Sequence, residues 1–371
     1  MLEFIIWEVQ PEIWPAGPLP VRWYGLFFAA AFALGQYIIT YIFKRDGRPV
    51  KDVDALTYYM IAGTVLGARL GHCLFYQPDY YLSNPLEILK IWEGGLASHG
   101  ATAGILISLW LYSRKRKDQS WLWILDRIVI VVALGGFFIR MGNLMNSEII
   151  GKPSDLPWSM VFAQPFGKAL METDGTRMES YRLSAADPSI HPEKPDQQAL
   201  ELTIHFNTEM DSSQARMVTS QLIPYLISRS NTDEVLIEAS LYPKLLLLVN
   251  ESGKSTLKTI VFGIPRHPAM AYEALSTLLI CVVLFVVWKK NPGIPEGRLF
   301  GIFVTVLFSL RFLYEFLKEN QVEFEDGLPL NMGQFLSLPM ILAGVFILFL
   351  PLFGQSKKNN QELDGNPSGL S

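Results

Sequence analysis

The densest group of side chains able to do chemistry runs from Arg140 to Gly151 and reads Arg-Met-Gly-Asn-Leu-Met-Asn-Ser-Glu-Ile-Ile-Gly. In a continuing helix, Arg140 and Asn143 lie on one face, and so do Asn143 and Asn146. A guanidinium beside amide donors suits a pair of anionic phosphate oxygens. The segment therefore predicts an anion-binding group, and a polar helix end that breaks at Gly151 is the alternative.

A histidine opens another apolar run, in the order Ser98-His99-Gly100-Ala-Thr-Ala-Gly104. A neutral imidazole can accept a proton from a thiol or hydroxyl near physiological pH. Gly100 and Gly104 form a small-xxx-small pair that lets a neighbouring helix approach closely. His99 is therefore a candidate general base, and a structural histidine is the alternative.

Two more apolar runs carry ionisable residues. One is entered by Arg266-His-Pro-Ala-Met-Ala-Tyr272-Glu273, and the other contains Arg311 and Glu315. A buried Glu273 can pair with an arginine and orient it without reacting. Arg311 and Glu315 face each other four residues apart on a helix, so an intrahelical ion pair is the alternative to a role in a site.

The elements that must position these residues are membrane helices. Half of the 371 residues are hydrophobic, 18% are charged and 12% are aromatic, whereas about a quarter of an average soluble domain is charged. The net charge of −4 gives no sign of a nucleic-acid partner. Cys73 and Cys281 lie in apolar runs, so neither a disulfide nor a thiolate metal site is expected. The N-terminus lacks the basic start of a cleavable signal peptide.

About seven apolar runs approach the length of roughly 20 residues that crosses a bilayer. They begin near Trp23, Ala55, Leu96, Trp121, Met270, Leu299 and Phe335. Alternate connections are basic and carry Lys44, Arg45, Arg48 and Lys51, then Arg114 to Lys117, then Lys289, Lys290 and Arg298, then Lys357 and Lys358. The positive-inside rule makes these connections cytoplasmic. The N-terminus is therefore expected outside and the C-terminus inside.

This topology gathers the ionisable residues near the outer face. Charged side chains inside a membrane are costly and by default mark a site lined by protein or water. Arg69 and His72 belong to the same outer group, but nothing in the sequence gives them a role beyond support of the pocket. Asp126 and Arg127, at the cytoplasmic start of their run, are expected to reach to the interface.

The polar stretch between the fourth and fifth runs predicts an extracytoplasmic, partly β insert. Strand-like segments lie at Leu200–Phe206 and Val235–Leu241, and the run Leu245–Val249 is expected to be a core strand. The expected parts are residues 1–162 with four spans and the main motif, 163–265 as the insert, 266–353 with three spans, and 354–371 as a disordered tail. The expected fold class is thus an all-α polytopic membrane protein with this insert.

The chain resembles the bacterial prolipoprotein diacylglyceryl transferases. The resemblance covers nearly all of the chain apart from the insert and tail. It rests on motifs in one order, namely Arg22-Trp-Tyr24-Gly25, His99-Gly100, Arg140 to Gly151 with Leu-Pro-Trp158, Arg266-His-Pro268 with Tyr272-Glu273, Arg311 with Glu315, and Met332-Gly-Gln334 with Leu336-Ser337.

This resemblance implies transfer of the sn-1,2-diacylglyceryl group from phosphatidylglycerol to the lipobox cysteine thiol of a preprolipoprotein, the first step of lipoprotein maturation. A thioether forms and glycerol phosphate leaves. It implies catalytic roles for Arg140 and Arg311 on the lipid phosphate and for His99 near the thiol. It places in the substrate pocket Tyr24, Gly100, Asn143, Asn146, Glu148, Gly151, Arg266, Tyr272, Glu273 and Glu315. The implied location is the bacterial inner membrane, with a site facing the outer leaflet and no cofactor or metal.

Some positions differ from the residues that are usual in the family. Ile139 stands where glycine is usual, Ala101 where a second glycine is usual, Met270 where glutamine is common, Leu307 where tyrosine is frequent, and Lys318 where arginine is usual. The insert is also longer than the family's compact arm.

Two other functions compete with this reading. A transporter would place polar residues at several depths of the membrane, whereas the inner halves of these runs are nearly all apolar. Another outer-leaflet lipid or headgroup transferase would use the same phosphate-binding arginines, and only the ordered motifs argue against it.

Overall fold

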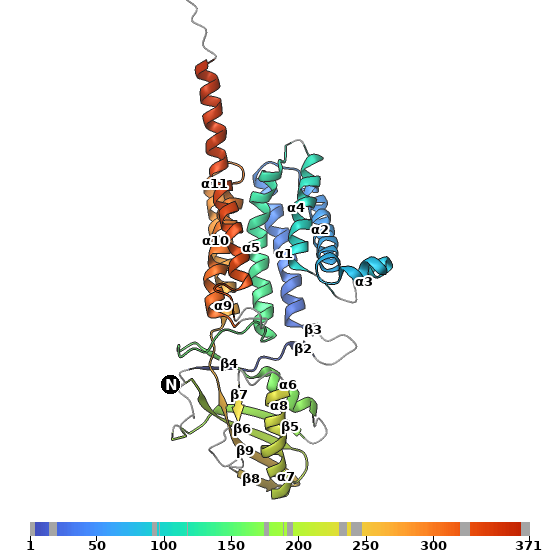
Figure 1. Cartoon of the computed structure of the whole chain (residues 1–371), viewed down its shortest axis with the longest axis vertical. Coiled ribbons are helices and arrows are strands. Elements are labelled where there is room, and N and C mark those ends of the chain that lie inside the picture. The colour runs from blue at the N-terminus through green and yellow to red at the C-terminus, as the bar shows by residue number, and fades with distance from the viewer. Residues whose placement is uncertain are drawn as a thin grey trace, which may run out of the picture. The chain divides into compact units, whose positions relative to one another are not determined.

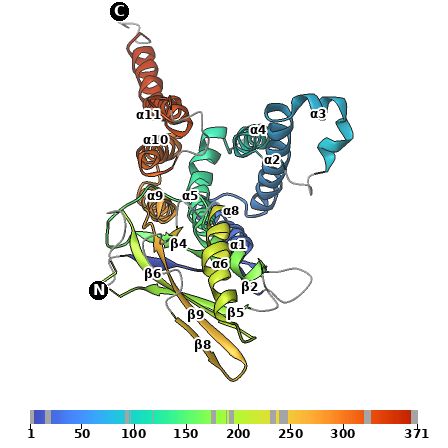
Figure 2. The ribbon, with the colours of Figure 1, turned by 60° about the horizontal axis from the view of Figure 1, so that its bottom comes forward.

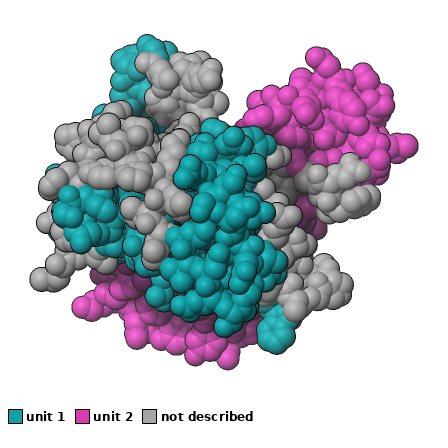
Figure 3. Space-filling view, turned by 90° about the horizontal axis from the view of Figure 1, so that it is seen from below, with its two compact units in different colours: residues 1–27, 139–274, 313–334 teal, residues 28–138, 275–312, 335–371 magenta. Residues whose placement is uncertain are grey.

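The computed structural model describes residues 4–14, 21–90, 95, 97–116, 118–173, 178–187, 189–190, 196–229, 236–238, 247–319 and 327–364. The chain divides into two compact units (Figure 3). Unit 1 comprises residues 1–27, 139–274 and 313–334, and unit 2 comprises residues 28–138, 275–312 and 335–371.

Every apolar run that the sequence indicated lies in a helix. The long helices are α1 (Trp23–Arg45), α2 (Lys51–Phe75), α4 (Ser98–Arg114), α5 (Trp121–Met145), α9 (Ala269–Lys290), α10 (Arg298–Tyr314) and α11 (Met332–Asp364). Five of them, namely α1, α5, α9, α10 with its following turn, and α11, are long and apolar enough to cross a membrane. Helix α2 is not in that group, and neither is α4, which has only 17 residues.

In unit 2 the long helices lie side by side with similar axis directions (Figure 1). Helices α2 and α4 approach each other through glycines. A Cβ built on Gly104 would lie 2.2 Å from the Gly63 carbonyl oxygen, and one on Gly100 would lie 2.4 Å from that of Gly67. The close approach predicted from Gly100 and Gly104 is therefore confirmed. The connection between these helices holds α3 (Pro78–Ser83) and the 3-10 turn η1 (Pro85–Leu89).

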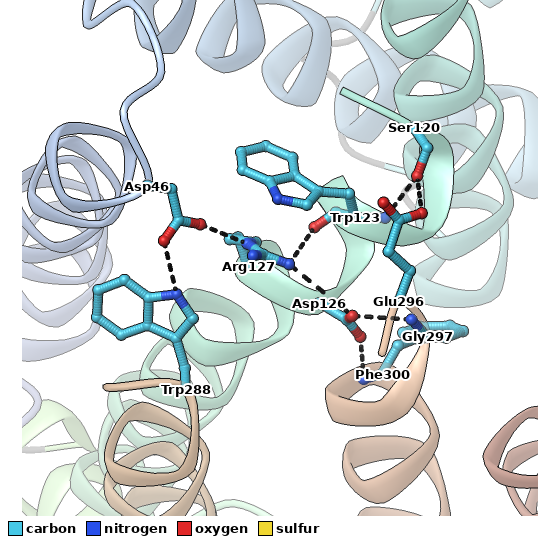
Figure 4. Close-up of polar contacts among 9 residues, drawn as sticks. All are labelled: Asp46, Ser120, Trp123, Asp126, Arg127, Trp288, Glu296, Gly297 and Phe300. Carbon is cyan, nitrogen blue, oxygen red and sulfur yellow. Dashed lines mark hydrogen bonds and ion pairs between the residues drawn. The ribbon is translucent and has the colours of Figure 1, made fainter. Parts of the chain in front are cut away.

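The expectation that Asp126 and Arg127 reach to the interface is wrong. Both side chains are buried within unit 2. The Asp126 carboxylate accepts the backbone N–H groups of Gly297 and Phe300, both at 2.8 Å, at the start of α10 (Figure 4). The physical reason is that a helix N-terminus offers unpaired N–H donors and a favourable dipole for a carboxylate.

Arg127 is held in the same part of unit 2 (Figure 4). Its Nε lies 2.9 Å from the Asp46 carboxylate, and its guanidinium lies over the Trp123 ring. Asp46 also accepts from the Trp288 indole at 3.2 Å. These contacts join the end regions of α1, α5, α9 and α10, so the two charged residues stabilise helix packing.

Unit 1 contains a five-stranded antiparallel sheet. Its strands are β5 (Met178–Ala185), β6 (Gln198–Phe206), β7 (Leu236–Glu238), β8 (Leu247–Glu251) and β9 (Lys254–Gly263), in the order β5-β6-β9-β7, with β8 also pairing with β9. The strand predicted at Leu200–Phe206 is confirmed as β6. The prediction at Val235–Leu241 is met by β7, and residues 235 and 239–241 lie outside the described part. The predicted strand Leu245–Val249 overlaps β8, which pairs only with β9 in the described sheet, and residues 245–246 are not described.

Three helices cover one face of this sheet (Figure 2). They are α6 (Gln164–Thr173), α7 (Ser212–Met217) and α8 (Ile223–Arg229), with a π-helical turn η3 (Val218–Leu222) between α7 and α8. The alternate residues Leu200, Leu202 and Ile204 of β6 are fully buried in one hydrophobic core with Phe166 and Leu170 of α6. Alternation along β6 thus points one face of the sheet at the helices.

The N-terminal arm of unit 1 is anchored by strand pairing. Strand β1 (Ile5–Trp7) pairs in parallel with β4 (Met160–Phe162), and β2 (Glu12–Trp14) pairs antiparallel with β3 (Val21–Arg22). The Trp7 indole donates to the Leu144 carbonyl at 3.1 Å. The arm therefore ends directly before α1 and is tied to the end of α5.

Helix α11 continues beyond the apolar run to Asp364. The sequence led us to expect a disordered tail from residue 354, whereas residues 354–364 are helical and 365–371 lie outside the described part. Lysine, glutamine and glutamate favour helix, and the next proline is Pro367.

Candidate active site

Arg140 lies one turn before the end of α5, within unit 1. Its Nε is 2.7 Å from Oε2 of Glu273, which lies in the second turn of α9. Its Nη1 also contacts the Met270 sulfur at 3.5 Å. The carboxylate is 9% exposed and the Arg140 side chain 22% exposed. Glu273 thus orients an arginine that stays accessible, as the sequence predicted for this glutamate.

A buried lysine extends this ion pair. The Nζ of Lys318 contacts Oε1 of Glu273 and lies 3.1 Å from Oε1 of Glu315. Lys318 follows the 3-10 turn η4 (Glu315–Leu317) at the end of α10, and its side chain is only 4% exposed. Arg140, Glu273, Lys318 and Glu315 form a connected group in which two cations and two carboxylates balance. We call these four residues the charge cluster.

A residue at the start of α11 contacts the charge cluster. Asn331 Nδ2 donates to Oε2 of Glu315 at 3.3 Å. Asn331 and Gln334 make reciprocal side-chain to backbone bonds at 2.8 and 3.1 Å, a capping arrangement that begins the helix. Gly333 leaves room for this carboxylate, because a Cβ at residue 333 would lie 2.5 Å from the Glu315 carboxyl carbon.

Asn143, Asn146 and Glu148 form a second group directly after Arg140. The Glu148 carboxylate accepts Nδ2 of Asn143 at 2.6 Å and Nδ2 of Asn146 at 3.1 Å. Helix α5 ends at Met145, and Ser147 and Ile149 each have a φ of 54°, a conformation that non-glycine residues adopt mainly where the surrounding structure enforces it. We call these three residues the amide–carboxylate group.

Tyr24 lies against the same end of α5. A Cβ on Gly142 would lie 2.5 Å from the Tyr24 ring, so the ring packs on a position that only glycine allows. The tyrosine is within electrostatic reach of both Glu148 and Arg140. The first turn of α1 therefore adds an aromatic hydroxyl beside the two groups.

Gly151 and Arg266 shape the backbone near these groups. A Cβ on Gly151 would lie 2.5 Å from the His267 carbonyl oxygen and 2.9 Å from that of Leu317. Arg266 donates to the Gly151 carbonyl at 3.0 Å and pairs with Glu319. The Arg266 side chain is buried, with 4% of its surface exposed. Its contacts with Gly151 and Glu319 join three chain segments. The expectation that Arg266 binds substrate stays a prediction.

Tyr272 makes a separate polar contact on α9. Its hydroxyl accepts from the Trp158 indole at 2.8 Å and lies 3.3 Å from Nδ1 of His267. Burial lowers the pKa of His267, an effect that the nearby Asp155 partly offsets. His267 is therefore expected to be neutral at physiological pH.

His99, Gly100 and Arg311 lie in unit 2, with Arg311 in the last turn of α10. His99 is exposed in the first turn of α4, with ring centroids 5.4 Å from Phe75 and 5.8 Å from Tyr76. Gly100 serves the contact with α2 that is described above. The structure thus gathers ten of the thirteen predicted residues in unit 1.

Arg69 and His72 support the connection between α2 and α4 in unit 2. Buried Arg69 donates to the carbonyls of Ile88 at 2.9 Å and Glu87 at 2.6 Å. His72 stacks on Tyr76 with a centroid distance of 5.4 Å. The expected role of these two residues in support of the pocket stays a prediction.

Lys318 was not among the residues expected in the site. The predicted pairing of Glu315 with Arg311 stays a prediction, and within unit 1 Glu315 contacts Lys318 and Asn331. The spacing of Glu315 and Lys318 was the available signal, because residues three apart on a helical turn are neighbours.

Known proteins match this chain over most of its length. The family model described as prolipoprotein diacylglyceryl transferase matches residues 11–350. A protein of Chloroherpeton thalassium named phosphatidylglycerol–prolipoprotein diacylglyceryl transferase is 35% identical over 347 residues, which are 93% of this chain and 94% of the relative. Proteins with the same name from Tolumonas auensis and Porphyromonas gingivalis are 33% and 32% identical, over 93% of this chain and 97% and 94% of their own lengths. The chain, a multi-pass membrane protein, therefore belongs to the prolipoprotein diacylglyceryl transferase family.

Proposed function

We propose that this protein transfers the sn-1,2-diacylglyceryl group of phosphatidylglycerol to the lipobox cysteine of preprolipoproteins. The cysteine sulfur forms a bond to the glycerol carbon that carries the phosphate, and the bond between that carbon and the phosphate oxygen breaks. Glycerol phosphate leaves with the bonding electrons, and the thiol proton passes to a base. The proposal rests on family membership and on the names of the relatives.

The observation that carries the proposal is the oriented guanidinium of Arg140. Its Nε is held by Glu273 at 2.7 Å, while the side chain remains 22% exposed. Charge develops on the phosphate oxygens as the glycerol carbon is released, and a prepositioned cation stabilises it most where water is excluded. Lys318 supports this role, because it binds the same carboxylate and adds positive charge nearby.

The other site residues are proposed to divide into three roles. Arg311 is proposed as the second phosphate-binding cation, and His99 as the base that takes the thiol proton. The residues proposed to touch substrate are Tyr24, Asn143, Asn146, Glu148 and Tyr272. Gly100, Gly151 and Arg266 are proposed to shape the pocket, and Glu273 and Glu315 to orient cations.

We further propose about seven crossings, with the N-terminus and the sheet of unit 1 outside the bacterial inner membrane. The four basic connections support this arrangement. The 17 residues of α4 span about 25 Å as helix, slightly less than the roughly 30 Å hydrocarbon core, and local thinning of the bilayer accommodates the difference. Single-cysteine labelling tests it: Thr208→Cys should react with an impermeant maleimide in intact cells and Asp118→Cys only after permeabilisation.

The transfer is tested with purified protein, labelled phosphatidylglycerol and a short peptide that bears a lipobox cysteine. We expect a thioether product and released glycerol phosphate. Arg140→Ala should lower kcat/KM roughly 100- to 1,000-fold, the usual cost of removing a group that stabilises transition-state charge. Arg182→Ala, which removes an exposed arginine of β5, is the matched control and should retain wild-type activity.

Two outcomes would overturn the proposal. Comparable turnover of a peptide with serine in place of cysteine would exclude a mechanism that depends on the thiol. Product formation without phosphatidylglycerol would exclude the assigned donor.

A further inference from the structure

A polar cleft of about 840 Å³ lies in unit 1 beside the amide–carboxylate group. Its volume falls within the roughly 300–1,000 Å³ typical of ligand pockets. Asn146 and Glu148 belong to its lining, so the cleft is continuous with the candidate active site. The rest of the lining comes from the N-terminal arm and from α6.

Strand pairing fixes the two walls of the cleft relative to each other. Strands β1 and β4 run in parallel, so the residues that follow them leave in the same direction. Gln10 and Glu12 follow β1, and Gln164 and Lys168 follow β4. A backbone bond of 3.1 Å from Ala163 to the Trp7 carbonyl extends this pairing up to the cleft. The cleft is therefore a built feature of the fold.

A buried amide donor of the lining has no acceptor among the described residues. Gln164, the first residue of α6, is 3% exposed, and its Nε2 makes no hydrogen bond within the described part of the chain. Buried polar groups in native proteins are nearly always paired. An amide N–H needs a carbonyl or similar oxygen as its acceptor. The cleft thus offers a donor to a ligand that brings such an oxygen.

The charges of the lining disfavour an anion. Three carboxylates and two cations line the cleft. Each cation is next to a carboxylate of the cleft: Arg22 lies 3.1 Å from Glu12, and Lys168 lies 3.7 Å from Glu172. The remaining carboxylate, Glu148, binds the two asparagines. A phosphate group would meet an excess of negative charge, and acyl chains would meet polar walls.

We propose that this cleft binds the polypeptide segment that follows the cysteine to be modified, an inference that rests on the proposed function. An extended chain supplies backbone carbonyl oxygens that are independent of side-chain sequence, and one of them accepts from Gln164. The excess negative charge then favours segments with lysine over segments with aspartate. This assigns a role to α6, the first helix of the stretch that the sequence marked as an insert.

The test compares lipobox peptides in the transferase assay with the full-length protein. A long peptide carries eight polar residues after the cysteine, and a short one ends one residue after it. The ratio of kcat/KM for the long peptide to that for the short one should fall about 2- to 10-fold in Gln164→Leu, the usual range for one hydrogen bond. Gln221→Ala, an exposed glutamine on η3 outside the cleft, should leave the ratio unchanged.

Charge preference gives an independent measurement. The wild-type protein should prefer a long peptide with two lysines over one with two aspartates, and Glu172→Lys should reduce that preference about 2- to 5-fold. Glu251→Lys, an exposed glutamate at the end of β8, is the matched control. An unchanged length ratio in Gln164→Leu would overturn the proposal. The proposal would also be overturned if Gln164→Leu weakened inhibition by glycerol phosphate but left the ratio of kcat/KM for the two peptides unchanged. The cleft would then bind the leaving group and not the peptide.

A binding measurement separates this inference from the proposed function. Fluorescence anisotropy with the long peptide, carrying serine in place of cysteine, should show a Kd about 2- to 10-fold weaker for Gln164→Leu than for the wild type. If no peptide yields product, the proposed function fails, whereas this binding difference would still support the cleft. Equal Kd values would refute the cleft.

Discussion

The ion pair between Glu273 and Lys318 should couple two buried charges in unit 1. Glu273 is 9% exposed and Lys318 is 4% exposed, and their charged groups are in direct contact. Glu273→Gln removes the carboxylate charge next to Lys318, and Lys318→Met removes the ammonium charge next to Glu273. Removing one partner of a buried pair costs about 3–5 kcal/mol. Each single variant should therefore be markedly less stable than the wild type.

The double variant should lose less than the sum of the single variants. Once both charges are gone, neither is left buried without its partner, so we expect a coupling free energy of about 1–3 kcal/mol. The matched pair for comparison is Glu201 and Lys258 on the sheet, which lie 2.7 Å apart but are 30% and 36% exposed. Exposed pairs contribute only about 0–1 kcal/mol.

Thermal unfolding in detergent, followed by tryptophan fluorescence, measures the difference. Lys318→Met should lower Tm by roughly 5–10 °C, and Lys258→Met by less than about 2 °C. Activity gives a second readout, because Glu273→Gln frees the guanidinium of Arg140 and should lower kcat/KM. Equal Tm losses for Lys318→Met and Lys258→Met would refute the reasoning, as would strict additivity in the cycle of Glu273 and Lys318.

Three further predictions address other parts of the chain. Burial raises the pKa of Glu8 above its ordinary value of 4.5. The contribution of Glu8 to stability is therefore greatest below pH 4.5 and is lost as pH rises through the raised pKa. Glu8→Gln should raise Tm at pH 8 and change it little at pH 4. A Cβ at residue 104 would lie 2.2 Å from a backbone oxygen, whereas a Cβ at residue 135 would meet no atom within 4 Å. Gly104→Ala should therefore cost about 1–3 kcal/mol of stability and lower Tm, while Gly135→Ala should not destabilise the protein. Asp126→Ala leaves buried N–H donors at the start of α10 unpaired and should lower Tm by an amount equivalent to about 1–3 kcal/mol; an unchanged Tm would show that these bonds do not stabilise the helix.

Side-chain contacts in the candidate site were predicted well where the residues are close in sequence. The run from Arg140 to Gly151 places a guanidinium and two amides on or near one helix end, and the structure keeps Asn143 and Asn146 on the same carboxylate. The sequence could not show that this carboxylate is Glu148, because the pairing depends on two residues with positive φ after the helix ends.

Charged residues near helix ends were predicted less well. Hydropathy indicates how far along a membrane span Asp126 and Arg127 lie, but not which residues they contact. Both were therefore expected at the membrane interface. Tertiary structure brings the start of α10 to Asp126 and places Asp46 beside Arg127. Lys318 was missed for the same reason, because its partner Glu273 is distant in sequence.

The sequence by itself determined the helical membrane character of this protein, its family and the helix ends that carry the side chains of the candidate site. These properties follow from local composition and spacing, since each apolar run must satisfy its own backbone bonds in lipid. Only tertiary structure decided which charges pair, that Arg266 donates to the Gly151 carbonyl, and that a polar cleft adjoins Glu148. The physical reason is that ion pairs and clefts form between segments far apart in the chain, where periodicity carries no information about contact.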